Sequence, residues 1–205
     1  TGKPMIMSTG MATKAEIEEA VNLVRSIGDN DITLLKCTST YPAKIDDSNL
    51  ATLPDLASTF SCKVGLSDHT QGIASAVAAT ALGACVIEKH FVLDRSAGGV
   101  DAAFSMEPAE LTLLVNTCRQ AAESLGEVTY GGTQAEQDFK KYRRSIYVSK
   151  DSKAGDVLND SNIRIIRPSL GLAPKHWPDV LGKTLTMDVR KGEALAWSMI
   201  VDSNG

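Results

Sequence analysis

The chain has 205 residues, of which 43% are hydrophobic and 22% are charged, and its formal net charge is −4. These values are typical of a globular protein, and they exclude an extended basic surface for nucleic acid. The one dense basic run, residues 140–144, is interpreted as a solvated connector. No apolar stretch reaches the roughly 18 residues that a membrane-spanning helix needs.

Four cysteines are scattered along the sequence and form no C-x-x-C pair: Cys37, Cys62, Cys85 and Cys118. Three of them lie in or beside segments that are predicted to be buried strands. Free thiols in a core are typical of a reducing compartment, so the cysteines predict a cytoplasmic protein.

Short apolar runs alternate along the first part of the chain with segments of helical periodicity. The predicted strands are 4–8, 32–37, 62–66 and 84–88. The predicted helices run from Thr13 toward Gly28, near 48–58, over 73–82 and over 108–124. Thr13 and Glu16 have the spacing of a capping box, and Gly28 is placed to end the first helix. This order predicts parallel strands joined by right-handed helical crossovers.

The character of the sequence changes near residue 133. Residues 133–143 are polar and predict a linker, while residues 144–205 contain short alternating segments typical of a small β-rich domain. Residues 1–132 hold four strand–helix units, whereas a complete (β/α)8 barrel needs eight units in about 250 residues. We therefore expect an α/β fold in which the first domain is the C-terminal half of such a barrel, within a longer protein. A complete four-stranded α/β layer is the alternative.

Two histidines follow neighbouring predicted strands: His69 in Gly-Leu-Ser-Asp-His and His90 in Ile-Glu-Lys-His-Phe. The carboxyl ends of parallel strands meet at one edge of a sheet, where α/β proteins place their chemistry. Two neutral imidazoles at that edge can share a divalent metal such as Mn²⁺, Zn²⁺ or Fe²⁺. Ordinary histidines that are satisfied by hydrogen bonds are the alternative.

Small hydroxyl residues also lie at predicted strand ends. Ser8 and Ser67 come before helix N-termini, where hydroxyl and backbone N–H groups can donate to a phosphate. Helix capping is the alternative role for both. Thr38, Ser39 and Tyr41 form a third polar cluster after the second strand, although this segment also suits an ordinary turn.

Asp101 and Arg167 are weaker signals. Asp101 follows two glycines in a loop near the fourth strand end, and a loop carboxylate is usually just solvated. Arg167 precedes Pro168 in the small domain. Surface arginines are common, so the sequence pattern alone assigns Arg167 no function.

In combination, five strings resemble the sialic acid synthase family, whose members condense phosphoenolpyruvate with an N-acylated amino sugar. The strings are Met-Ser-Thr-Gly-Met at 7–11, Lys-Cys-Thr-Ser-Thr-Tyr-Pro at 36–42, Gly-Leu-Ser-Asp-His-Thr at 65–70, Ile-Glu-Lys-His-Phe at 87–91 and Gly-Gly-Val-Asp-Ala-Ala-Phe-Ser-Met at 98–106. The small domain is similar to the family's SAF module, which resembles type III antifreeze proteins. Lys36, Ser39 and Ile166-Arg167-Pro168 resemble the pseudaminic acid synthase branch.

The resemblance implies roles around a metal. His69 and His90 match the two metal-binding histidines of the family, with Mn²⁺ or Mg²⁺ as the expected cofactor. Asp101 matches an acidic residue beside the metal and the open-chain sugar, and it is one expected catalytic residue. Arg167 matches an arginine that enters the neighbouring subunit's site, which implies a domain-swapped homodimer.

The resemblance also implies contacts to the substrates. Ser8 and Ser67 match phosphate contacts of the family. Ser39 and Tyr41 match positions at the phosphoenolpyruvate carboxylate and the sugar, and Tyr41 is the second expected catalytic residue. Ser39 stands where sialic acid synthases usually carry asparagine, which makes its contact the least secure.

The expected reaction joins phosphoenolpyruvate to a 6-deoxy-2,4-diacetamido hexose, giving pseudaminic acid and phosphate. Two alternatives stay open: an N-acetylneuraminate synthase that uses N-acetylmannosamine, and a non-catalytic sugar-binding fragment. The family draws lysines for phosphoenolpyruvate and a catalytic glutamate from the half barrel that precedes the matching segment. We therefore expect this chain by itself to have little or no activity.

Overall fold

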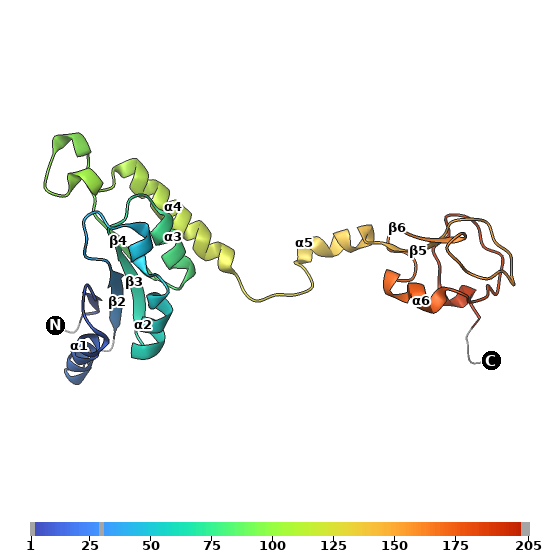
Figure 1. Ribbon diagram of the computed structural model, residues 1–205, viewed down its shortest axis with the longest axis horizontal. Helices are drawn as coiled ribbons and strands as arrows, with labels where there is room; N and C mark the ends of the chain where they lie inside the picture. The colour runs from blue at the N-terminus through green and yellow to red at the C-terminus, as the bar shows by residue number, and fades with distance from the viewer. Residues whose placement is uncertain (1–2, 29–30, 202–205) are drawn as a thin grey trace. The chain divides into compact units, whose positions relative to one another are not determined.

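The computed structural model describes residues 3–28 and 31–201 of a chain that divides into two compact units, one ending at Glu127 and one beginning at Val128 (Figure 1). Each unit has its own cluster of buried hydrophobic side chains. A separate core is the mark of a structural domain, so each unit has its own source of stability.

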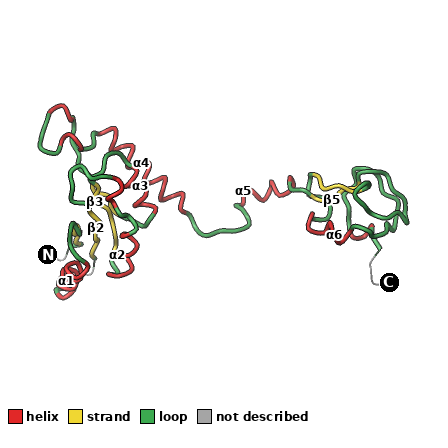
Figure 2. Tube along the Cα trace, viewed as in Figure 1, coloured by secondary structure: helices red, strands yellow, loops and turns green. Residues whose placement is uncertain are grey.

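Unit 1 is built on a four-stranded parallel sheet (Figure 2). Its strands lie in the order β1 (Met5–Ser8), β2 (Ile32–Cys37), β3 (Lys63–Asp68) and β4 (Val86–Lys89). In the register of the sheet, Cys37 lies opposite Ser67, and Ser67 lies opposite Glu88. The predicted alternation of parallel strands with helices is confirmed.

Four helices connect and follow these strands: α1 (Lys14–Ser26), α2 (Thr52–Phe60), α3 (Ala74–Ala81) and α4 (Pro108–Leu125). The predicted capping box is present, because Thr13 N donates to the Glu16 carboxylate at 2.7 Å and Glu16 N donates to Thr13 Oγ1. Gly28 follows α1 at a φ of 94°, which glycine adopts readily. Among the described residues, no helix is long and apolar enough to cross a membrane.

The second helix begins later than the sequence predicts, because of Pro54. A helix that began at residue 48 would place Pro54 in its interior, where the ring would clash with a carbonyl of the preceding turn. Instead, a short 3₁₀ helix, η1 (Ile45–Ser48), comes first, and Asn49 adopts a left-handed φ of 46°. The helix α2 then begins at Thr52, so Pro54 falls in its first turn.

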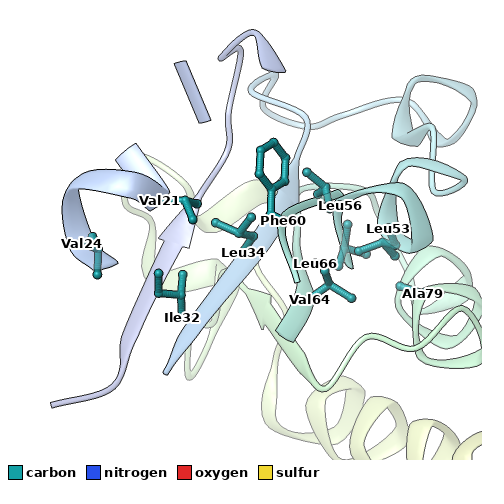
Figure 3. Close-up of a cluster of buried hydrophobic side chains, with 10 residues drawn as sticks. All are labelled: Val21, Val24, Ile32, Leu34, Leu53, Leu56, Phe60, Val64, Leu66 and Ala79. Carbon is teal, nitrogen blue, oxygen red and sulfur yellow. The ribbon is translucent and has the colours of Figure 1, made fainter. Parts of the chain in front are cut away.

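The core of unit 1 lies on the face of the sheet that the helices cover (Figure 3). Ile32, Leu34, Val64 and Leu66 alternate along β2 and β3, so they point to this face, and each is at most 4% exposed. The helices contribute Val21, Val24, Leu53, Leu56, Phe60 and Ala79. The residues between these apolar positions point to the opposite face, which carries Ser67 and Glu88 as well as Leu35.

The loop predicted over 95–105 and the linker predicted over 133–143 both contain short helical turns. These are η2 (Arg95–Ala97), η3 (Ala102–Phe104), α5 (Gln134–Gln137) and η4 (Asp138–Tyr142). Another capping box, between Thr133 and Glu136, holds the start of α5. Such turns rest on local hydrogen bonds, which hydrophobic periodicity does not reveal.

Unit 2 has an antiparallel pair, β5 (Ser145–Val148) with β6 (Ile163–Ile166), followed by η5 (Pro174–His176), α6 (Trp177–Val180) and η6 (Trp197–Met199). The later alternating segments, 185–189 and 194–200, form isolated bridges instead of strands. They are too short and too often interrupted by turns to sustain a ladder. Six hydrophobic side chains at most 1% exposed lie in the core of the unit: Ile146, Leu158, Ile163, Val180, Leu185 and Leu195.

Gly65 of β3 occupies a position with no room for a side chain. A Cβ atom there would lie 2.5 Å from Leu35 Cδ2 and 2.5 Å from the Val86 carbonyl oxygen. We expect Gly65→Ala to force the strands apart and to lower the free energy of unfolding by about 1–3 kcal/mol, the usual effect of overpacking. Urea denaturation measures this change. Lys63→Ala, at the exposed start of the same strand, is the control and should have little effect; an unchanged midpoint for Gly65→Ala would contradict the close packing.

Candidate functional site

His69 and His90 each follow a strand directly, His69 after β3 and His90 after β4. Asp68 and Lys89 are partners at the last rung of these two strands, so the next residue of each strand lies at the same level. The two imidazole centroids are 5.2 Å apart, with an angle of 59° between the ring planes. The structure therefore brings together the two histidines that the sequence singles out.

A hydrogen bond to the backbone fixes the orientation of the His69 ring. Its Nδ1 atom lies 2.9 Å from the carbonyl oxygen of Thr38. A carbonyl oxygen can only accept, so Nδ1 carries the proton in the neutral ring and Nε2 keeps its lone pair. The Cys37 sulfur lies 4.0 Å from the same Nδ1 atom, and the histidine is only 8% exposed. The buried ring is thus prepared to offer Nε2 to a metal or a substrate.

Lys36 supports the turn that carries the Thr38 carbonyl group. Its Nζ atom donates to the Cys37 carbonyl oxygen at 2.9 Å and to Thr38 Oγ1 at 3.4 Å. Burial lowers the pKa of Lys36, because the charged form loses contact with water. This lysine thereby stiffens the backbone on which the orientation of His69 depends.

His90 faces a carboxylate. Its Nδ1 atom is 3.5 Å from Asp101 Oδ2, and the two side chains are 31% and 47% exposed. Asp101 directly precedes η3, and Ser105 donates its backbone and side-chain hydrogens to the Asp101 carbonyl oxygen at 3.2 and 2.7 Å. The sequence presents Asp101 as a loop carboxylate, and the structure places it beside the second histidine.

An arginine anchors the loop that carries Asp101. The Arg95 guanidinium donates to Glu110 at 2.6 and 3.1 Å and lies 3.1 Å from a Glu107 oxygen. It also donates to the Ser105 carbonyl oxygen at 3.1 Å. The hydrogen bond from Arg95, followed by one from the Glu107 backbone, lowers the pKa of Glu110. These bonds attach the loop to the start of α4 and so position Asp101.

Aromatic rings surround the histidine pair. The Tyr41 ring is 4.3 Å from the His69 ring and 5.7 Å from the His90 ring, centroid to centroid. Phe104 packs edge-on against His90 at 5.2 Å and lies 6.0 Å from Tyr41. Sequence reasoning found Tyr41 but missed Phe104, because the path of its loop depends on contacts distant in sequence. Tyr41 remains 54% exposed and therefore accessible to a substrate.

Ser67 and Glu88 are joined across the polar face of the sheet. Ser67 donates its hydroxyl hydrogen to Glu88 at 2.7 Å, and both residues line a hollow of about 240 Å³ together with His69, Lys89 and His90. A serine has one hydroxyl proton, so in this arrangement Ser67 has none left for a phosphate. A phosphate contact requires Ser67 to turn away from Glu88. The sequence places Glu88 on the same face as His90 but gives it no role.

The two remaining serines lie at the ends of β1 and β2. Ser8 is exposed, whereas its neighbour Thr9 is buried and donates through both N and Oγ1 to the Leu35 carbonyl oxygen. Ser39 Oγ lies 3.6 Å from the Cys37 sulfur and 3.6 Å from where a Cβ atom would be on Gly10. The loops after β1 and β2 therefore adjoin.

Arg167 lies in unit 2, directly after β6. It is exposed, and no ion pair holds it within the part of the chain that the structure describes. Nearby, Ser145 Oγ donates to the Pro168 carbonyl oxygen at 2.8 Å and accepts from Gly171 N at 3.0 Å, which fixes the turn after Arg167. The arginine is thus presented on a firmly bonded turn.

The histidine pair fits a divalent metal. Metal–nitrogen bonds of about 2.0–2.1 Å place the rings of two ligands roughly 5 Å apart, and the observed separation is 5.2 Å. No group of three or more His, Cys, Asp or Glu side chains within residues 3–28 and 31–201 has the geometry to hold a metal ion. The described residues therefore offer a cation two adjacent imidazoles, and any cation bound there would need further donors.

The fold and the site define an α/β unit of barrel type, with two adjacent histidines at its strand ends, joined to a small β-rich unit. Residues 1–130 match the model of the NeuB family, and residues 143–201 match the model of the SAF domain. The chain belongs to the NeuB family, so the resemblance drawn from its five strings is confirmed.

Individual relatives match two thirds or more of this chain. The chain is 41% identical over 193 residues to pseudaminic acid synthase of Campylobacter jejuni subsp. jejuni serotype O:2, covering 94% of this chain and 56% of that protein. It is 40% identical over 196 residues to N,N'-diacetyllegionaminic acid synthase of the same strain, covering 94% and 59%. The sialic acid synthetase structure from Leptospira borgpetersenii serovar Hardjo-bovis matches with a TM-score of 0.62 at 36% identity, covering 67% of this chain and 48% of that one. This chain spans a little more than half the length of the two curated relatives.

The Thr38 hydrogen bond predicts one tautomer of His69. We expect the neutral ring to carry its proton on Nδ1, because Nδ1 faces a group that can only accept. A long-range ¹⁵N–¹H correlation spectrum of the histidine-labelled protein distinguishes the two tautomers. A neutral His69 that carries its proton on Nε2 would contradict the geometry of the site.

Proposed function

We propose that this chain is the C-terminal part of a nonulosonic acid synthase that joins phosphoenolpyruvate to a 6-deoxy-2,4-diacetamido hexose. The observation that carries the proposal is the pair of imidazoles, 5.2 Å apart at the carboxyl ends of β3 and β4 in a member of the NeuB family. Relatives of about 40% identity are named as pseudaminic and diacetyllegionaminic acid synthases, which supports this class of reaction. The products in this proposal are pseudaminic acid and phosphate.

In this proposal His69 and His90 hold a divalent cation, with Mn²⁺ or Mg²⁺ as the first candidates. A bound cation of this kind is a Lewis acid that can polarise a carbonyl oxygen. The Thr38 carbonyl supports the proposal, because a partner at the far nitrogen of a histidine fixes the ring and makes it a better ligand. Asp101 plays the corresponding part at His90, 3.5 Å away.

Asp101 and Tyr41 are proposed to position the sugar. The Asp101 carboxylate is half exposed beside His90, so it can accept hydrogen bonds from sugar hydroxyls. Tyr41 packs on His69 with about half of its surface open. Holding the sugar aldehyde against the enol carbon of the second substrate supplies much of the rate in a two-substrate condensation.

The serines at the strand ends are proposed to bind phosphoenolpyruvate. Ser8 ends β1, and Ser39 lies in the loop after β2, which adjoins the loop after β1. Their hydroxyl groups can donate to phosphate and carboxylate oxygens. Ser67 joins them only when its hydroxyl leaves Glu88, so substrate binding must exchange one hydrogen bond for another. We assign the remaining cationic contacts to the part of the relatives' length that this chain does not cover.

We further propose a homodimer in which Arg167 of one copy enters the site of the other. The support is an exposed guanidinium on a rigid turn, with no ion pair among the described residues. The proposed location is the cytoplasm, where the four free cysteines would stay reduced. An N-acetylneuraminate synthase is the second candidate, favoured by the 36% identity to the Leptospira structure.

The proposed metal site predicts that His69 and His90 are both essential for cation binding. We expect His69→Ala and His90→Ala each to weaken Mn²⁺ binding by more than the roughly 10–100-fold that loss of an outer partner costs. Titration calorimetry and the Mn²⁺ paramagnetic resonance signal measure this. His176→Ala is the matched control, because His176 lies in unit 2 beside Asp179. Equal binding by all three variants would exclude the site.

The proposed reaction predicts activity only in a protein that also contains the first half of the proposed barrel. We expect a full-length protein carrying this segment to release phosphate fastest with the 6-deoxy-2,4-diacetamido hexose, and the 205-residue chain to have little or no activity. A panel with N-acetylmannosamine and the legionaminic precursor sugar tests the choice of substrate. Faster turnover of N-acetylmannosamine would favour the second candidate. Sugar binding without turnover of any of them by the full-length protein would indicate a non-catalytic module.

A further inference from the structure

A buried ion pair lies next to the two histidines, on the opposite face of the sheet. Lys89 Nζ is 2.8 Å from Asp68 Oδ2, and the two side chains are 4% and 1% exposed. Asp68 and Lys89 are partners at the last rung of β3 and β4. Each directly precedes one histidine, so strand alternation points it toward the helices while the imidazoles point the other way.

Both carboxylate oxygens of Asp68 are hydrogen-bonded. Oδ1 accepts from Thr70 N at 2.9 Å and from Thr70 Oγ1 at 2.7 Å, while Oδ2 accepts from Lys89. Lys89 Nζ also donates to the Thr70 carbonyl oxygen at 2.6 Å. The residues on both sides of His69 therefore belong to one network, and this network is bonded to the residue before His90.

This network is the last connection between the two strands before their chains diverge. The His69 carbonyl oxygen accepts from Ala43 N, in the segment after β2, at 2.9 Å. The His90 carbonyl oxygen accepts from Met106 N, in the segment before α4, at 2.8 Å. The two histidine backbones thus have different neighbours. The Asp68–Lys89 contact closes the β3–β4 ladder directly before the two histidines.

A contribution to folding stability does not by itself explain why a charged pair is buried at the end of β3 and β4. Taking two charges out of water costs solvation energy, and apolar residues of similar volume are often at least as stabilising. An ion pair instead specifies one arrangement of the two strands, because its hydrogen bonds are satisfied only in that arrangement. Lys89 also lines a cavity of about 430 Å³, but its side chain is only 4% exposed, so protein covers most of its ammonium group.

We infer that Asp68 and Lys89 are positioning residues, which hold His69 and His90 at the separation that lets them share a divalent cation. The inference rests on the proposed metal site and extends it to residues that touch neither the cation nor a substrate. It assigns the pair an effect on cation affinity that is separate from its effect on folding.

The test compares Lys89→Met with the double variant Asp68→Leu/Lys89→Met. The double variant replaces the charges by apolar groups of similar size and leaves no unpaired buried charge. We expect both to bind Mn²⁺ about 10–100-fold more weakly than the wild type, the range found when partners of metal ligands are lost. The nuclear Overhauser contact between the ring protons of His69 and His90 in the metal-free protein should weaken in parallel.

Lys63→Met is the matched control. It removes an exposed lysine from an ion pair with Asp31, 2.7 Å long, at the opposite end of β3. Its Mn²⁺ affinity should equal that of the wild type, and so should the nuclear Overhauser contact between the His69 and His90 rings. Circular dichroism and thermal unfolding establish that each variant is folded.

The outcomes separate the positioning role from the metal site. If the folded double variant binds Mn²⁺ as tightly as the wild type does, the positioning role is overturned and the proposed metal site is unaffected. A wild-type chain that does not bind Mn²⁺, or a His69→Ala variant that binds it equally well, would overturn both. A double variant that does not fold would show the pair to be structural, which also overturns the inference.

Discussion

The last rung of the β3–β4 ladder sets the arrangement of the polar face of unit 1. At this rung Asp68 lies opposite Lys89, and the two side chains form a buried ion pair among the helices. Side chains along a strand alternate, so the same rung directs His69 and His90 to the opposite face. A shift of β3 by one residue would turn each of its side chains to the other face of the sheet. His69 would then be buried where the Asp68 carboxylate now lies. Register is therefore the physical constraint on which the candidate site depends.

The two faces of the sheet have different physical tasks. On one face, apolar strand residues pack against α1, α2 and α3, and burial of that surface is the main favourable term for folding. On the other face, polar groups stand close together at the strand ends, where they must be satisfied by one another or by a ligand. Gly65 shows how tightly these demands are combined, because its position between Leu35 and Val86 admits no side chain.

Polar groups of the site already have partners. Thr38 accepts from His69, Asp101 faces His90, and Glu88 accepts from Ser67. Such partners orient donors and acceptors before a ligand arrives, which reduces the reorganisation that binding would otherwise require. Ser67 has one hydroxyl proton, and the hydrogen bond to Glu88 uses it. Unit 2 has its own core, so the turn that carries Arg167 is held by contacts within that unit.

Several features follow from the sequence by itself, because their causes are local. Hydrophobic periodicity placed the strands and helices of unit 1, and the Thr13–Glu16 spacing predicted a capping box that the structure contains. Strand alternation and parallel order brought two histidines to one edge, and five strings identified the family. Other features needed the tertiary structure. Phe104 stands beside His90 because Arg95 anchors its loop, and Ser67 meets Glu88 because two strands share a register. Loop paths and register depend on contacts between distant residues, and local sequence patterns carry no direct record of such contacts.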